Sequence, residues 1–337
     1  MTSKDDTAAA PLRPGAAASR ATRIGKYVGW RTVVRRLVGA VVVVWGAATL
    51  AFLALNLTPG DPARTLVGAA PATSGTIDQI RADLRLDDPW PLRYLFYLGK
   101  LLRGDLGTSY QQDLPVSTVI RGQLGATVQL TVAAAALAVL GALVVALVTA
   151  HRRRGVRSTA SVVELVLAST PTFWLGVLLL VLFSFTLHIF PVSGNAGVSA
   201  LVLPAVTLAL PIGAMLSQVL RESLEDVLER PFVLTARARG MRETGIRLRH
   251  ALRHAALPLV TLSGLVIGHL LGGAVIIEMI FARQGVGRIA LAAIEGKDFP
   301  VVIAVVVLSA LVFVVVNLIV DLICLLIDPR LAAEPAI

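Results

Sequence analysis

The chain has 337 residues, of which 56% are hydrophobic and only 15% are charged, and its mean hydropathy is +0.78. These values exclude an ordinary soluble domain and predict a polytopic membrane protein. The formal net charge of +10 would suit a nucleic-acid partner, but the arginines stand beside apolar spans, as topology-setting charges do. We therefore expect membrane lipid, and no nucleic acid, around this chain.

Residues 1–36 are rich in Ala, Pro, Ser and Arg without apolar periodicity, and they predict a basic, largely disordered cytoplasmic tail. The first apolar span, 37–57, is long enough to cross the hydrocarbon core as a helix. A cleaved signal peptide is the alternative, because basic residues precede the span. Its apolar core exceeds the usual h-region of about 7–15 residues, so we expect a retained helix.

The segment 58–123 is expected on the opposite side of the membrane and is too long for a simple turn. It opens with the turn-forming sequence TPGDP at 58–62. Pro89 precedes an amphipathic stretch at 90–102, whose aromatic residues suit the headgroup layer. Glycines at 104–107 then permit a sharp turn. We predict a small folded extracytoplasmic cap.

A membrane core at 124–328 contains five further apolar spans, at 124–150, 162–189, 200–220, 259–281 and 301–327. Each is predicted to be helical because lipid offers backbone amides no other partner. The fold class is therefore all-α, with six transmembrane helices, and Pro171 and Pro211 are expected to interrupt the third and fourth. Arg and Lys concentrate before the first span, after the second and between the fourth and fifth. This places both termini, including the tail at 329–337, in the cytoplasm.

The loop at 225–258 is the most organised of the basic segments. Pro231 is typical of a helix start and Gly240 of a helix end. The short helix between them carries an apolar stripe and two arginines that project elsewhere: Phe232, Val233 and Ala236, with Arg237 and Arg239. A second, basic helix at 246–256 is expected to stop at Pro258. An ordinary loop that binds anionic lipid is the alternative, but it requires less organisation than this.

Ten short sequences, in order, resemble the permease subunits of ABC importers. They are most similar to the sequences of the dipeptide/oligopeptide/nickel permease family. They are TPGDP at 58–62, GDLGTS at 104–109, PTFWLG at 171–176, FPVSG at 190–194, TARARG at 235–240, HALRHA at 250–255, EMIF at 278–281, GVGR at 285–288, DFP at 298–300 and DPR at 328–330. The chain departs from the family at Pro231-Phe232, where many members carry an acidic residue and Tyr, and at Leu234, where the general motif has Glu.

The resemblance implies a type I importer fold, with an extracytoplasmic insertion after helix one and a cytoplasmic coupling helix between helices four and five. That helix docks into a groove on a cytoplasmic ATPase subunit. The coupling residues would be Phe232, Val233, Ala236, Arg237, Arg239 and Gly240. ATP and Mg would bind on one or two partner ATPase subunits, because this chain has no G-x-x-x-x-G-K-[ST] loop and no cofactor site of its own.

The other implied partners are a second, similar permease and an extracytoplasmic binding protein that docks on 58–123. The family implies a heterodimer of permeases in the inner or plasma membrane, and the sequence leaves a homodimer open. Di- and oligopeptides are the leading substrates, with nickel chelates, haem, glutathione or sugars as alternatives.

Polar residues inside the predicted spans are candidates for lining the translocation path, because such residues are costly in lipid. His269 and Glu278 in the fifth span and Gln129 in the second are the main candidates, with Thr127 on the same polar face as Gln129. Interhelical hydrogen bonding or packing is the alternative. Glu278 lies near the outer surface and is also placed to cap the adjacent loop.

Two other functional classes were weighed. A secondary transporter driven by an ion gradient predicts buried acidic residues near the bilayer midplane, and only Glu278 and His269 come close. An intramembrane hydrolase needs a serine or metal centre in the bilayer, whereas Ser193-Gly194 lies in an outer loop and no H-E-x-x-H occurs. Neither class explains the loop at 225–258.

Overall fold

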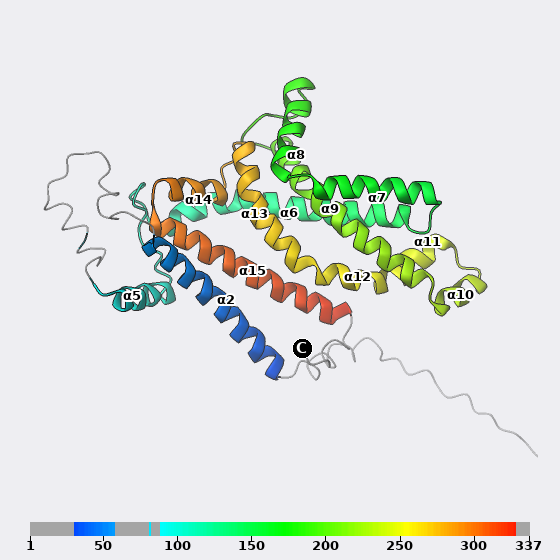
Figure 1. Cartoon of the computed structure of the whole chain (residues 1–337), viewed down its shortest axis with the longest axis horizontal. Helices are drawn as coiled ribbons and strands as arrows, with labels where there is room; N and C mark the ends of the chain where they lie inside the picture. The colour runs from blue at the N-terminus through cyan, green and yellow to red at the C-terminus, as the bar shows by residue number, and fades with distance from the viewer. Residues whose placement is uncertain (1–29, 58–80, 82–87, 328–337) are drawn as a thin grey trace, which may run out of the picture.

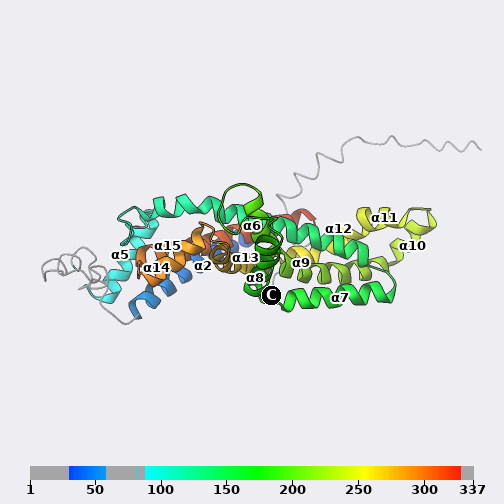
Figure 2. The ribbon, with the colours of Figure 1, turned by 90° about the horizontal axis from the view of Figure 1, so that it is seen from above.

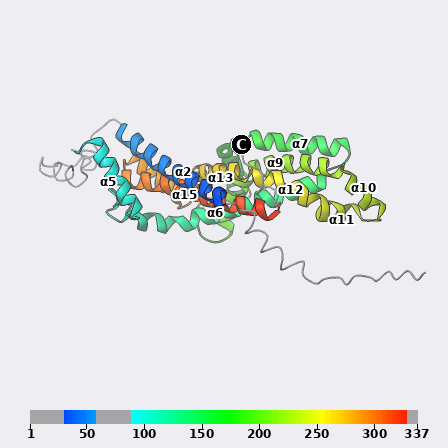
Figure 3. The ribbon, with the colours of Figure 1, turned by 90° about the horizontal axis from the view of Figure 1, so that it is seen from below.

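The computed structural model describes residues 30–57, 81 and 88–327, and in this part the regular elements are all helical, as predicted. The helices form an elongated array with α5 near one end and α10 and α11 at the other (Figures 1, 2 and 3). The elements are α2 (Trp30–Leu57), α5 (Trp90–Leu102), α6 (Val116–Thr149), α7 (Arg154–Ser169), α8 (Thr172–Leu179), the π-helix η1 (Leu180–Thr186), α9 (Ser199–Leu228), α10 (Pro231–Ala238), α11 (Glu243–Gly245), the π-helix η2 (Ile246–Ala251), α12 (Leu252–Thr261), α13 (Ser263–Ile280), α14 (Val286–Glu295) and α15 (Phe299–Ile327). The predictions for the N-terminal tail before residue 30, the TPGDP turn and the C-terminal tail lie outside the described residues.

Among the described residues, four helices are long and apolar enough to cross a membrane: Val34–Ala54, Val116–Thr149, Ser199–Leu228 and Phe299–Cys324. They match the first, second, fourth and sixth predicted spans. The bent pair α7 and α8–η1 makes a fifth if it counts as one span. The predicted span 259–281 falls on α12 and α13, of which Gly268–Ile280 is a shorter apolar helix. The count of six therefore stays a prediction.

The third span is not the continuous helix expected at 162–189. The chain bends by 102° between α7 and the following helix, so that α8 projects away from α7 (Figure 1). The break falls at Thr170, which is extended at ψ 126°, directly before Pro171. A proline disfavours helical geometry in the preceding residue and has no N–H to continue the ladder. The interruption predicted at Pro171 is confirmed, whereas α9 runs on through Pro211 to Leu228 and the one predicted there is wrong.

The second and fourth spans form the central helix pair, α6 against α9. One face of α6 carries alanines at every fourth residue, all with at most 1% of their surface exposed: Ala134, Ala138, Ala142 and Ala146. On α9, a Cβ added to Gly213 would lie 3.2 Å from the Ala138 carbonyl oxygen. Small residues at this spacing let two helix backbones approach closely in a membrane.

α5, the turn that follows it and the start of α6 can each be compared with the local sequence signals. α5 begins directly after Pro89, as predicted, and its Tyr94 and Tyr97 rings contact Phe52 of α2 at centroid distances of 5.3 and 5.6 Å. Gly104 and Gly107 adopt φ of +73° and +78°, which confirms the predicted turn. α6 begins at Val116, eight residues before the predicted start at 124, so the segment 58–123 includes two turns of that helix.

Candidate coupling loop and buried polar clusters

The loop after α9 contains the predicted short helix and its glycine break. α10 begins at Pro231, ends at Ala238, and is followed by Gly240 at φ +75°. The Gly240 N–H donates to the Arg237 carbonyl at 2.9 Å, and the Met241 N–H donates to that of Ala236 at 3.2 Å. These bonds satisfy the last carbonyls of α10, and the left-handed backbone favours glycine at 240. The sequence therefore folds this segment into a helix with a defined end.

Val233 attaches α10 to the rest of the helical array. Its side chain has 0% of its surface exposed and lies in a cluster with residues of α6, α9, η2 and α12, including Leu224, Leu228, Ile246 and Ala255. Burying a valine contributes about 1.5–3 kcal/mol to stability. Val233 is thus an internal anchor of α10 and has no surface to offer to another subunit in the described conformation.

The opposite face of α10 is open. Leu234 is 63% exposed and Phe232 is 38% exposed, although the Phe232 ring also contacts the His254 ring at a centroid distance of 5.6 Å. Arg239 is exposed, whereas Ala236 is half-buried against the cluster around Val233. An exposed leucine, Leu234, and an exposed arginine, Arg239, on one short segment suit a protein partner.

Arg237 spans the glycine break. Its Nε donates to Glu243 Oε1 at 2.7 Å, and both side chains are at least one-third exposed. The hydrogen bond from Arg237 lowers the pKa of Glu243 below its ordinary value, and the same bond raises that of Arg237. The pair links α10 to α11 on the surface and adds little to overall stability, because solvent screens it.

The second half of the loop differs from the prediction. The stretch expected as one helix at 246–256 is the π-helix η2 followed by α12, and Pro258 lies inside α12 instead of ending it. The Leu262 N–H still donates to the Pro258 carbonyl at 3.1 Å, so the ladder resumes after the proline. Prolines are tolerated in helices of membrane proteins where neighbouring groups satisfy the freed carbonyl.

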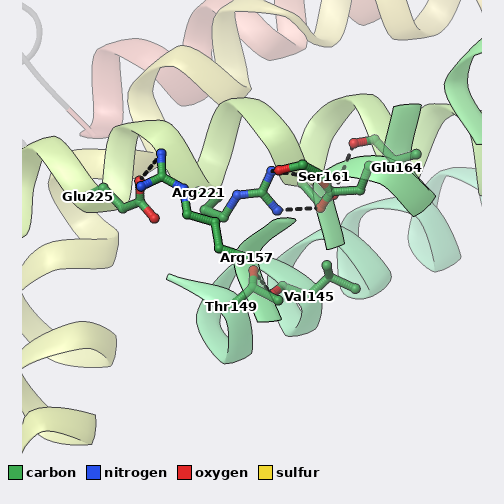
Figure 4. A network of polar contacts seen from close by, with 9 residues as sticks. Val145, Thr149, Arg157, Ser161, Glu164, Arg221 and Glu225 are labelled. Atoms are coloured by element: carbon green, nitrogen blue, oxygen red, sulfur yellow. Dashed lines mark hydrogen bonds and ion pairs between the residues drawn. The ribbon is translucent and has the colours of Figure 1, made fainter. Parts of the chain in front are cut away.

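A buried ion pair joins α7 to α9 close in sequence to the loop at 225–258. Arg221 donates from Nη1 to Glu164 Oε1 at 2.8 Å and from Nη2 to Oε2 at 2.6 Å, and each side chain is only 5% exposed. Ser217 donates to the same carboxylate at 2.6 Å, and Ser161 accepts from Arg221 at 3.1 Å. Figure 4 shows the two charged groups facing one another, with the pair Arg157–Glu225 nearby, in which the arginine is 54% exposed and the glutamate 12% exposed.

Sequence reasoning missed this pair. Arg221 follows the predicted end of the fourth span at 220 and so counts among the basic residues between the fourth and fifth spans, yet it lies within α9. Glu164 is an isolated carboxylate within the third predicted span. An unpaired charge is so costly in lipid that an acidic residue in one span and an arginine near the end of the next are a signal for pairing.

Glu278 caps the start of α14. Its Oε2 accepts from the N–H groups of Gly287 at 2.8 Å and Arg288 at 3.3 Å, and Thr127 Oγ1 donates to Oε1 at 2.5 Å. Thr127 in turn accepts from the Val286 N–H at 2.8 Å. These contacts satisfy the first amides of α14, where a carboxylate is also favoured by the helix dipole.

The three candidates for a polar path do not share a site. Glu278 has 1% of its surface exposed and is engaged with α14. Gln129 is exposed on α6 and His269 is exposed on α13. The structure brings Glu278 together with Thr127, and leaves Gln129 and His269 outside that cluster.

Two further buried charges hold connecting loops in place, and sequence reasoning assigned neither a site role. The Asp298 carboxylate accepts from the Ser109 hydroxyl at 2.5 Å and from the Tyr110 and Gln111 N–H groups at 3.1 and 3.3 Å. Arg283, 1% exposed, donates to the Ala200 carbonyl at 3.0 Å. Asp298 thereby fixes the loop before α6 to the loop before α15, and Arg283 fixes the loop after α13 to the start of α9.

Comparison with known proteins matches most of the chain to one family. Residues 138–333 match the binding-protein-dependent transport system inner membrane component, and residues 30–131 match the N-terminal part described for the same membrane components. The glutathione transport system permease protein GsiC of Pectobacterium atrosepticum is 37% identical over 302 residues, covering 88% of this chain and 97% of that protein. The proteins of the same name from Salmonella choleraesuis and Escherichia coli K12 are 35% and 33% identical over 300 residues, covering 89% of this chain and 98% of each.

The organised loop after α9, the apolar helices and these matches agree. Permease subunits of this kind carry no ATPase site of their own. The chain belongs to the family of binding-protein-dependent transport system inner membrane components, and it is a permease subunit of an ABC importer of the dipeptide/oligopeptide type.

Proposed function

We propose that this chain forms half of the translocation path for short peptides, with glutathione as the first candidate, delivered by an extracytoplasmic binding protein. The proposal is supported by the GsiC relatives, which are glutathione transport system permease proteins, since glutathione is itself a modified tripeptide. Its partners would be a second permease and cytoplasmic ATPase subunits that bind ATP and Mg. Both termini would lie in the cytoplasm, on the same side as α10.

The observation that carries the proposal is the two-sided construction of α10. Val233 fixes one face of α10 in the core shared by α6, α9 and α12, and Leu234 lies exposed on the other face of α10. A partner that displaces the exposed face therefore moves a packed unit, because close-packed interiors transmit displacement. We assign Phe232, Leu234, Arg237 and Arg239 to the contact face, Val233 and Ala236 to the anchor, and Gly240 to the helix end.

The buried carboxylates support ATP-driven transport over ion-driven transport. Glu164, Glu278 and Asp298 each accept at least three hydrogen bonds from neighbouring groups. A carboxylate engaged in this way is structural, whereas an ion-coupled transporter needs one that releases its partner during the cycle.

The test is co-expression of this chain with its candidate second permease, ATPase and binding protein, followed by reconstitution into proteoliposomes. Glutathione or a dipeptide, with the binding protein, should stimulate ATP hydrolysis and enter the vesicles. Leu234→Glu should abolish co-purification of the ATPase, and Leu102→Glu, which changes an 88% exposed leucine on α5, should not. Import on an ion gradient without ATP, or an ATPase that binds equally to both variants, would contradict the proposal.

A further inference from the structure

A polar recess of ≈ 250 Å³ is lined by residues of the start of α6 and the turn before it, of α14 and the loops on either side of it, and of the start of α15. These elements lie at the end of the molecule away from α10 (Figure 1). Its walls carry an unusual concentration of carboxamides, one guanidinium and one carboxylate, with small apolar side chains between them. The polar residues are Gln111, Gln112, Gln123, Gln284, Arg288 and Asp298. Neither the coupling loop nor the central helix pair uses these groups.

Arg288 is the cation of the recess. Its backbone N–H is fixed by Glu278, while its side chain is exposed and makes no hydrogen bond or ion pair within the described part of the chain. A guanidinium in this state keeps its five donors available, and a carboxylate matches their planar, two-pronged geometry.

The opposite wall is held by Asp298. Because its carboxylate accepts from the Tyr110 and Gln111 N–H groups, the turn that carries Gln111 and Gln112 is fixed beside the recess. The Gln111 carboxamide rests on Gly296, where an added Cβ would overlap its Nε2. The Asp298 carboxylate is 2% exposed and already accepts three hydrogen bonds, so it is a structural member of this wall.

The third wall is fixed through Gln284. Its N–H donates to Asn195 Oδ1 at 3.2 Å, and its carbonyl accepts from Asn195 Nδ2 at 2.9 Å. The segments that carry Gln111 and Gln284 are thus attached to the fold by specific bonds. Such preorganisation lowers the entropic cost of binding a small ligand.

We infer that this recess binds the carboxylate end of a short peptide, a step that rests on the proposed function and names where such a substrate contacts this subunit. Arg288 pairs with the carboxylate, and the glutamine carboxamides donate to and accept from the adjacent peptide group. The volume is below the roughly 300–1,000 Å³ of sites that enclose a drug-sized ligand. The recess therefore takes a terminal residue and leaves the remainder of the peptide outside.

The experiment uses the assembled transporter in lipid nanodiscs without binding protein, and measures binding of glutathione, a dipeptide and the same dipeptide with an amidated carboxyl terminus by ligand-observed NMR. The free dipeptide should bind at least about tenfold more tightly than its amide, since a hydrogen bond to a charged group is worth about 1.5–3 kcal/mol. Arg288→Gln should remove this preference. Arg121→Gln, on an exposed arginine of α6 outside the recess, should keep it.

A second variant tests the opposite wall independently. Gly296→Ala should displace the Gln111 carboxamide and weaken binding of the free dipeptide, with the thermal unfolding of each variant checking that it folds. Equal affinity for acid and amide in the wild-type complex, no binding at all, or an unchanged preference in Arg288→Gln would overturn the inference. If the wild-type complex with its binding protein imports neither glutathione nor dipeptides, the proposed function fails instead.

Discussion

Removing one member of the Glu164–Arg221 pair should destabilise the permease far more than removing both. Arg221→Met leaves a carboxylate that is 5% exposed with only the Ser217 hydroxyl as a donor, and Glu164→Leu leaves the guanidinium with only Ser161. Breaking a buried pair in this way costs about 3–5 kcal/mol. The double variant leaves neither charge, so its cost should fall to about 1 kcal/mol, because buried pairs replaced by apolar residues are often nearly neutral.

The assay is a double-mutant cycle on reversible unfolding of the detergent-solubilised chain. The matched control is the exposed pair Arg237–Glu243, whose N–O distance is a similar 2.7 Å but whose side chains are 36% and 51% exposed. Removing either control residue should cost at most about 1 kcal/mol. The reasoning is refuted if the Glu164→Leu and Arg221→Met costs simply add in the double variant, since additivity would mean that the two groups do not interact.

Three further outcomes follow from the structure. Val233→Ala should lower the free energy of unfolding by about 2 kcal/mol, from the buried methyl groups lost, and should weaken substrate-stimulated ATP hydrolysis; unchanged stability would show that α10 is not anchored there. Gly287→Ala places a Cβ 2.5 Å from a backbone atom of α13 and should cost about 1–3 kcal/mol in a thermal or denaturant melt, whereas Gly125→Ala, with open space around it, should have little effect. Arg237 lowers the pKa of Glu243, so the pair's small contribution to folding stability is present above the ordinary carboxyl pKa and is lost as pH falls through the lowered pKa. In an NMR titration, Arg237→Gln should return the Glu243 pKa toward its ordinary value, and an unchanged pKa would contradict the pairing.

Local signals were enough to predict several elements. The φ preference of a proline or glycine is local and does not depend on the surrounding fold. It explains Pro89 before α5, the glycines around 104–107 and Gly240 after α10. The apolar spans were equally legible, because lipid permits few alternatives to a helix. These features depend on the chain near them and on the solvent, and therefore appear in the sequence.

The prolines show where such signals stop. Pro171 coincides with a bend of 102°, whereas Pro211 and Pro258 lie inside helices that continue. The residue type is the same in all three places, so the neighbouring packing decides whether the helix continues. No pattern along one helix reveals that packing.

The candidate site was predictable in outline and not in orientation. The limits of α10 follow from Pro231 and Gly240, but the sequence gives Phe232 and Val233 the same apolar character. Only the contact of α10 with α9, η2 and α12 turns Val233 inward and leaves Leu234 outside. Likewise, Glu164 and Arg221 meet across 57 positions of sequence, and their register depends on how α7 lies against α9.

The alanine face between α6 and α9 has a mechanical consequence. Alanine has no side-chain torsion that can rearrange, so neither helix can slide past the other by exchanging one set of side-chain positions for another. Gly213 removes the remaining clearance by bringing α9 to the backbone of α6. We expect α6 and α9 to move as one rigid body whenever the transporter opens. The hinge of that motion should lie at breaks such as the one between α7 and α8.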